Sequence, residues 1–157
     1  WDDPIEGYKS GKEYLIPCLE THKPIDLVVI MLGTNDLKKR FSLSALDIAN
    51  GAGVLVDIVQ KSNTGPDEGA PKVLLLAPPP IARLAGTEFG EMFDEEAEPK
   101  SRKFSEQYKR VAEEYGCEFL DTSEVIVSSD IDAIHLELSD HRKLGKAVAD
   151  KVKKILG

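Results

Sequence analysis

A histidine and an aspartate three residues apart are the first side chains in this sequence whose types and spacing suggest chemistry. His135 is one of three histidines, and it follows Asp132 in a stretch with the composition of a loop. At this spacing a carboxylate can accept a hydrogen bond from one ring nitrogen and leave the other free to take up a proton. The pair predicts a general base oriented by an acid. The alternative, that it only ties down a turn, stays open.

A side-chain amide that could assist such a base occurs earlier, in Gly33-Thr34-Asn35-Asp36. The apolar run 25–32 ends at Gly33, so Asn35 lies just beyond an expected buried strand. An amide donor in this position can stabilise the negative charge of an oxyanion. Asn and Asp also cap turns frequently, so a purely structural role for Asn35 and Asp36 is the alternative.

The elements that must position these side chains follow from the apolar periodicity. Apolar residues at helical spacing alternate along the chain with short apolar runs of the kind that form strands. Prolines, caps and turn formers separate the segments. We expect, in chain order, a helix over 11–23, a strand over 25–32, a helix from the cap Ser44 to Lys61, a strand over 72–77, a helix over 104–115 ended by Gly116, a strand over 117–120 and a last helix capped by Ser139.

Strands that alternate with helices form right-handed βαβ units, which give a parallel sheet with helices on both faces. The run 25–32 is unbroken and rich in β-branched residues, a pattern typical of a strand covered on both faces. Ligands of such folds bind beyond the carboxyl ends of the strands. The stretches 33–36, 78–80 and 132–135 all come after expected strands, so we expect them to meet on one rim.

Composition limits the classes of function. The chain has 157 residues, a normal length for one domain, and we expect a single domain over residues 1–157. Its net charge of -8 disfavours a nucleic-acid partner, and its apolar runs are too short to cross a membrane. Cys18 and Cys117 have apolar neighbours and are expected as buried, reduced thiols, which favours a cytoplasmic location.

The motifs together resemble a known family. The apolar strand with 33–36 behind it, and the late stretch 132–135, are similar to two conserved blocks of the SGNH hydrolases, also called GDSL esterases and lipases. The segments 13–19, 26–32 and 72–80 resemble the arylesterase and acyltransferase branch of that family. The resemblance covers nearly the whole chain.

This resemblance implies a three-layer, flavodoxin-like α/β fold with a parallel sheet, and neither a cofactor nor a metal. It implies that His135 is the general base, that Asp132 orients it and that Asn35 donates to the oxyanion. Thr34 and Ile134, which neighbour these residues, are then expected to line the pocket for the acyl or alcohol group.

The nucleophile of the family is missing from this sequence. None of the ten serines lies in a Gly-Asp-Ser or Gly-x-Ser-x-Gly context, and the glycine of the family's second block is also absent. We therefore expect this chain to be the C-terminal portion of an SGNH domain and to be inactive alone. The strand 25–32 would then expose an apolar edge, against which the N-terminal segment of the same protein lies as a separate or cleaved chain.

The leading hypothesis is a serine esterase or acyltransferase that acts on small carboxylic esters through an acyl-enzyme, with the serine outside this chain. A noncatalytic or regulatory α/β domain that lacks the nucleophile is the alternative. A metal-dependent hydrolase using Asp36, Asp132 and His135 is disfavoured, because three histidines in total are few for a two-metal site. The natural substrate is not evident from the sequence, and a homo-oligomer stays open.

Overall fold

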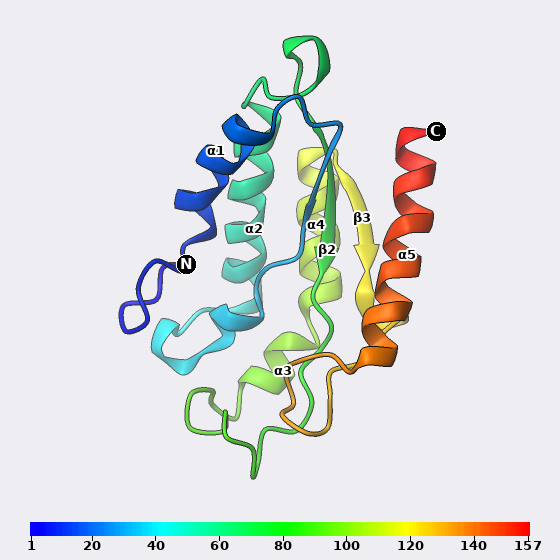
Figure 1. The fold of residues 1–157 in the computed structure, drawn as a ribbon. Coiled ribbons are helices and arrows are strands. Elements are labelled where there is room, and N and C mark those ends of the chain that lie inside the picture. The colour runs from blue at the N-terminus through cyan, green and yellow to red at the C-terminus, as the bar shows by residue number, and fades with distance from the viewer.

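The centre of the fold is a parallel sheet of three strands. The computed structural model describes all residues from Trp1 to Gly157. Its strands are β1 (Leu27–Ile30), β2 (Lys72–Ala77) and β3 (Glu118–Asp121), in the order β1-β2-β3 (Figure 1). In register, Val28 lies beside Val73 and Leu75 beside Phe119.

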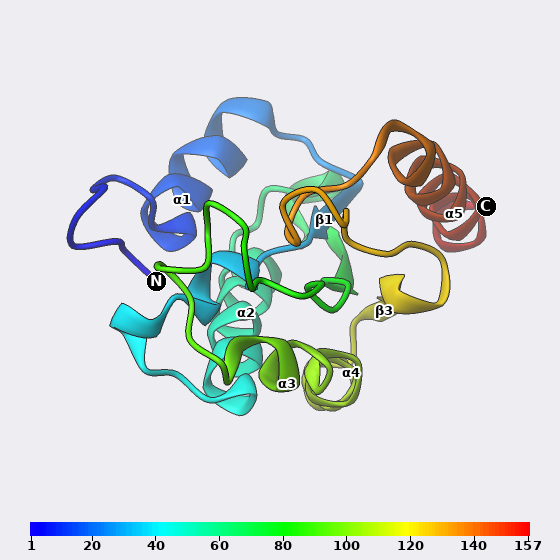
Figure 2. The same ribbon diagram turned by 90° about the horizontal axis from the view of Figure 1, so that it is seen from below.

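Helices cover the sheet on two sides and complete the three-layer α/β fold that the sequence predicts. They are α1 (Gly11–His22), α2 (Ala45–Gln60), α3 (Ala97–Ser101), α4 (Phe104–Tyr115) and α5 (Leu138–Leu156). The helices α2 and α4 pack on each other and on one face of the sheet, and α1 packs on α2. Figure 2 shows α5 on the opposite side of the sheet, where it contacts β3.

Local sequence signals set the start of α2 and the end of α4 as expected. Ser44 caps α2 through a reciprocal capping box: its hydroxyl oxygen accepts from the Asp47 backbone N–H at 3.1 Å, and its own N–H donates to the Asp47 carboxylate at 3.1 Å. Gly116 ends α4 in the left-handed conformation, with φ of 62°. Gly53 allows α2 and α4 to approach closely, since a Cβ there would lie 2.8 Å from the Tyr115 ring.

The middle strand is buried on both faces, but β1 is not. Leu74 and Leu75 of β2 are fully buried, whereas Val29 is 43% exposed, Met31 37% and Leu32 50%. The expectation that 25–32 is covered on both faces is therefore wrong. The physical reason is that helix packing covers β1 mainly on one face: α2 packs on β1, whereas α5 on the opposite side of the sheet packs on β3 (Figure 2).

Three smaller expectations also need correction. The last helix begins at Leu138 and not behind Ser139, because the carbonyl of Glu137 accepts the first helical hydrogen bonds, from Asp140 and His141. The short helix α3 was not expected within the irregular stretch before α4. The two cysteines are free thiols, but they are half-buried.

No helix has the length and apolar character needed to span a membrane.

Candidate active site

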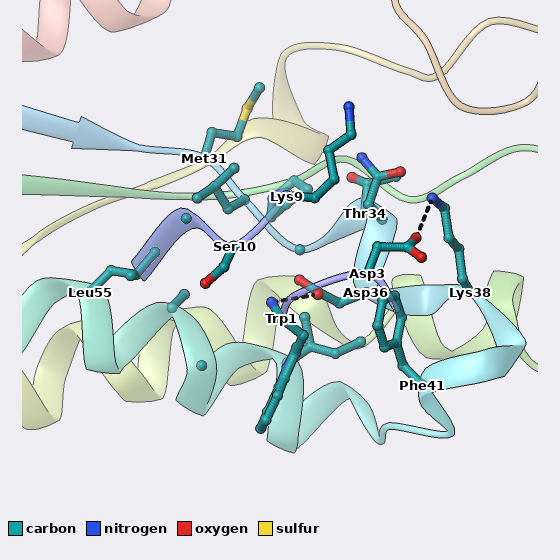
Figure 3. Close-up of a pocket in the computed structure, with 18 of the residues that line it drawn as sticks. Trp1, Asp3, Lys9, Ser10, Met31, Thr34, Asp36, Lys38, Phe41 and Leu55 are labelled. Atoms are coloured by element: carbon teal, nitrogen blue, oxygen red, sulfur yellow. Dashed lines mark hydrogen bonds and ion pairs between the residues drawn. The ribbon is translucent and has the colours of Figure 1, made fainter. Parts of the chain in front are cut away.

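Loops that follow the strands meet at one end of the sheet, as predicted. A cavity of about 600 Å³ opens there. Thr34 and Asn35 line it from the loop after β1, Pro78 and Pro79 from the loop after β2, and Ile134 from the loop before α5. Figure 3 shows this cavity, with Thr34 on its wall. The structure thus places both predicted pocket residues, Thr34 and Ile134, on the lining of one cavity.

His135 and Asp132 are joined by a short hydrogen bond at the edge of this site. The His135 Nδ1 atom lies 2.6 Å from Asp132 Oδ2. The other carboxylate oxygen, Oδ1, accepts the backbone N–H groups of Ile134 and His135, both at 2.9 Å. Burial alone would raise the pKa of Asp132, but these two N–H groups and the imidazole lower it below its usual value.

The ring of His135 is oriented so that its second nitrogen is available. The side chain is 68% exposed, and Nε2 makes no hydrogen bond within the chain. A carboxylate held ionised by backbone donors fixes the tautomer in which Nδ1 carries the proton and Nε2 can accept one. The pair therefore has the arrangement of a general base with its orienting acid.

Backbone hydrogen bonds hold the loop that carries this pair. Ala133 is fully buried and has a positive φ of 71°. Its N–H donates to the Ser129 carbonyl at 2.9 Å, and its own carbonyl accepts from Ala82 N–H at 2.8 Å. The Ser129 N–H in turn donates to the His135 carbonyl at 2.7 Å. Because Ala82 belongs to the loop after β2, the base is positioned against that strand end.

Phe89 is a neighbour of the base that the sequence did not indicate. Its ring meets the His135 ring edge to face, with centroids 5.7 Å apart. It lies in the irregular acidic stretch before α4, where no periodicity marks it. The aromatic edge limits the positions open to the imidazole and forms an apolar wall beside it.

Asn35 lies in a short 3₁₀ turn, Thr34–Leu37, directly behind Gly33. Gly33 has a φ of 140°, a conformation that L side chains rarely adopt. The hydroxyl of Tyr108 donates to the Leu32 carbonyl, just before this turn, at 2.5 Å. The side chain of Asn35 is exposed and makes no hydrogen bond within the chain, so its amide is available to a ligand.

Asp36 does not join the other acidic and histidine side chains in a metal site. No group of three or more His, Cys, Asp or Glu side chains is arranged to hold a metal ion. Asp36 instead accepts a hydrogen bond from the Trp1 amino group at 3.0 Å, and burial raises the pKa of Asp36 above its usual value in spite of this contact.

Comparison with known proteins identifies the family. The sequence model of the GDSL-like lipase/acylhydrolase family matches residues 5–142. The chain belongs to this family. No curated protein matches it.

Several solved structures resemble this GDSL-like hydrolase along its whole length. Est24, a carbohydrate acetylesterase from Sinorhizobium meliloti, is 41% identical with a TM-score of 0.93, and the match covers 99% of this chain and 73% of that one. The aryl esterase of M. smegmatis is 40% identical with a TM-score of 0.92, and the match again covers 99% and 73%. A putative arylesterase from Agrobacterium tumefaciens str. C58 is 34% identical with a TM-score of 0.88, covering 99% and 74%. Family and neighbours thus indicate an esterase or acylhydrolase.

Ser10, at the amino end of α1, is a serine that lines the cavity. It makes no hydrogen bond with His135. Figure 3 shows Ser10 beside Leu55, on the side of the cavity formed by the helices. The structure therefore joins His135 to Asp132 and pairs no serine of the chain with His135. Asn35 lines the cavity together with Ile134 and Leu136, the neighbours of His135, whereas His135 itself does not line it.

Proposed function

We propose that this GDSL-like hydrolase cleaves small carboxylic esters through an acyl-enzyme intermediate, with a serine nucleophile that lies outside the 157 residues. His135 is the general base, Asp132 orients it and Asn35 donates to the oxyanion. The observation that carries the proposal is the 2.6 Å bond between Asp132 and His135 Nδ1, which leaves Nε2 free, while Ile134 and Leu136 on either side of His135 line the same cavity as Asn35. This is the arrangement needed to activate a hydroxyl group.

The steps follow from these positions. The serine oxygen attacks the ester carbonyl while His135 Nε2 takes its proton, and the carbonyl oxygen becomes an oxyanion that accepts a hydrogen bond from the Asn35 amide. The tetrahedral intermediate collapses, and protonated His135 gives the proton to the departing alcohol. Water or a second alcohol then attacks the acyl-enzyme, His135 takes the proton of this nucleophile, and the serine leaves reprotonated.

The open edge of β1 supports the proposal that a separate segment supplies the serine. The apolar side chains of Met31, Leu32 and Leu55 line the cavity beside this edge. Such an edge can be completed by an added strand. About a quarter of each related esterase chain lies outside the match. We propose that the N-terminal segment of the same protein, as a preceding or separate chain, lies against the edge of β1 and places its serine between His135 and Asn35.

The lining of the site bears on the esters that it can accept. Thr34 and Ile134 stand next to the proposed donor and the proposed base, so they border both halves of a bound ester. The related structures include a carbohydrate acetylesterase and an aryl esterase. Because Pro78, Pro79 and Ile134 make this wall apolar, we propose that an alcohol can compete with water for the acyl-enzyme, which would give acyl transfer beside hydrolysis.

Hydrolysis of 4-nitrophenyl acetate tests the proposal. The 157-residue chain alone should give no burst of 4-nitrophenol, and the protein as the organism makes it should turn the ester over. In that protein, His135→Ala should lower kcat by about 10³-fold or more. His141→Ala is the matched control, because His141 is exposed in the first turns of α5 and should have no effect. Equal losses from both variants, or no turnover by the whole protein, would favour a noncatalytic domain.

A further inference from the structure

A buried tyrosine on α4 holds the turn that carries the proposed oxyanion donor. We infer that Tyr108 is a positioning residue for Asn35: its hydroxyl fixes the peptide before Gly33 and so sets the direction of the Asn35 amide. The inference rests on the proposed function and adds a residue that does not touch the substrate.

The hydrogen bond of Tyr108 connects two distant parts of the chain. The phenol oxygen donates to the Leu32 carbonyl at 2.5 Å, across 76 positions of sequence. No other group of the chain donates to that carbonyl. Tyr108 is fully buried and packs on Phe104, with ring centroids 5.4 Å apart. Burial and the nearby charge of Asp36 raise the pKa of Tyr108 far above its usual value, so the hydroxyl stays a donor.

The turn and the tyrosine fit each other closely. A Cβ on Gly33 would lie 2.1 Å from the Tyr108 hydroxyl and 3.1 Å from Ile48 Cγ2. Any side chain at position 33 would therefore collide with the Tyr108 hydroxyl that binds the Leu32 carbonyl. The positive φ of 140° at Gly33 turns the backbone away from the direction of β1 and presents Asn35 at the rim.

The far end of the same turn is held by the loop before α3. Lys39 N–H donates to the Met92 carbonyl at 3.0 Å, and Lys38 forms an isolated bridge with Phe93. Leu37 is 2% exposed and anchors the turn in the core. Figure 3 shows the turn from Thr34 to Lys38 along the cavity wall. Both ends of the turn are thus fixed, and the Asn35 side chain between them is free of internal hydrogen bonds.

This arrangement matters for catalysis because an oxyanion donor acts only when it is held in place before the charge develops. Loss of the phenol hydroxyl would leave the Leu32 carbonyl without a partner and allow its peptide to rotate, which would move Asn35. A displacement of about 1 Å at a reacting group can cost about 100-fold in rate.

A double-mutant cycle in the protein as the organism makes it tests the inference. Tyr108→Phe should lower kcat for 4-nitrophenyl acetate by about 10- to 100-fold with KM changed less than about threefold. In an Asn35→Ala background the same substitution should cost less than about twofold, because the donor that it positions is gone. Tyr115→Phe is the matched control. It removes a hydroxyl from the same helix that makes no hydrogen bond, and it should leave kcat unchanged.

An equal loss of kcat from Tyr108→Phe with and without Asn35 would overturn the inference, since it would show a general structural effect. A second readout is independent of turnover. The NMR signal of the Asn35 side-chain amide should shift in Tyr108→Phe and stay in place in Tyr115→Phe, with the Asn50 amide, whose oxygen accepts from Arg110, as the internal reference. An unmoved Asn35 signal in Tyr108→Phe would contradict the inference, whether or not the wild-type protein turns over the ester. Absence of turnover by the wild-type protein would by itself contradict only the proposed function.

Discussion

At the scale of single residues, the carboxylate of Asp132 organises the proposed base. It accepts two backbone N–H groups with one oxygen and the imidazole of His135 with the other. The backbone donors keep the group ionised, and the short loop fixes its distance from the ring. The proposed role of Asp132 is therefore to hold the histidine in one tautomer and to stabilise its protonated form.

We expect Asp132→Asn to lower kcat of the whole protein by on the order of 10³- to 10⁴-fold, because an amide in this place stabilises the wrong tautomer and cannot stabilise imidazolium. Steady-state kinetics with 4-nitrophenyl acetate measures the effect. Asp130→Asn is the matched control, since Asp130 is exposed two residues earlier and makes no hydrogen bond through its side chain. An Asp132→Asn enzyme that keeps more than a tenth of the wild-type kcat would contradict this role.

The sequence indicates some site residues and conceals others for a clear physical reason. His135 and Asp132 are close in the chain, so spacing alone predicts their hydrogen bond, and Asn35 is marked by the end of an apolar run. Phe89 contacts His135, 46 positions away, and Tyr108 contacts Leu32, 76 positions away. In the sequence Tyr108 is one apolar position of a helix, and nothing local shows that its hydroxyl meets the end of β1.

At the scale of elements, the junction between β1 and the following turn depends on one glycine. We expect Gly33→Ala to lower the free energy of unfolding by on the order of 3 kcal/mol, because the new Cβ meets both a strained φ and the Tyr108 hydroxyl. Urea denaturation measures the change. Gly145→Ala, in open space on α5, should be neutral or stabilising by about 0.5–1 kcal/mol. Equal stabilities of the two variants would contradict the close fit at Gly33.

The edge of β1 leads to a prediction about association. We expect the 157-residue chain alone to self-associate, because Val29, Met31 and Leu32 are exposed beside an unpaired strand. Met31→Lys should raise the monomer fraction measured by light scattering, since a lysine disfavours edge-to-edge pairing. Val127→Lys, which changes a 66% exposed side chain in the loop before Ser128, should not. A stable, well-folded monomer of the unmodified chain would contradict the proposal that a partner covers this edge.

The order of the elements was predictable, and the exposure of β1 was predictable only in part. Alternating strand and helix patterns predict the parallel sheet, because the apolar spacing of a helix differs from the short apolar run of a strand and turn-forming residues separate the segments. The apolar run 25–32 has the pattern of a strand covered on both faces, yet the edge and Val29 are open. A strand's own sequence records the burial that it requires but does not identify the segment that provides it.

At the scale of the whole molecule, a charged cluster ties the first residues of the chain to the site. Asp3 and Lys38 are almost fully buried, and Lys38 Nζ lies 3.2 Å from Asp3 Oδ2. Glu6 and Arg40 complete the cluster. Burial opposes ionisation of Asp3, but backbone N–H groups, Lys38 and Arg40 lower its pKa to about 2. Asp3, Glu6 and Lys38 of this cluster line the cavity, and Figure 3 shows the ion pair between Asp3 and Lys38.

This cluster predicts how stability depends on pH. A carboxyl group whose pKa is lower in the folded chain stabilises the fold above its unfolded pKa and loses that contribution as the pH falls through the folded value. We expect the free energy of unfolding to fall between about pH 4 and pH 2. Asp3→Asn should flatten this decrease, and the exposed neighbour Asp2→Asn should not. Identical pH profiles for the two variants would rule out Asp3 as the source.

The most direct test of the central claim is to label the protein, as the organism makes it, with a serine-reactive phosphonate and to locate the adduct by mass spectrometry. We predict one adduct on a serine outside these 157 residues, formed much more slowly when His135 is replaced by alanine. An adduct on Ser10 or on any other serine of this chain would contradict the account, because the nucleophile would then lie among residues that the structure does not pair with His135.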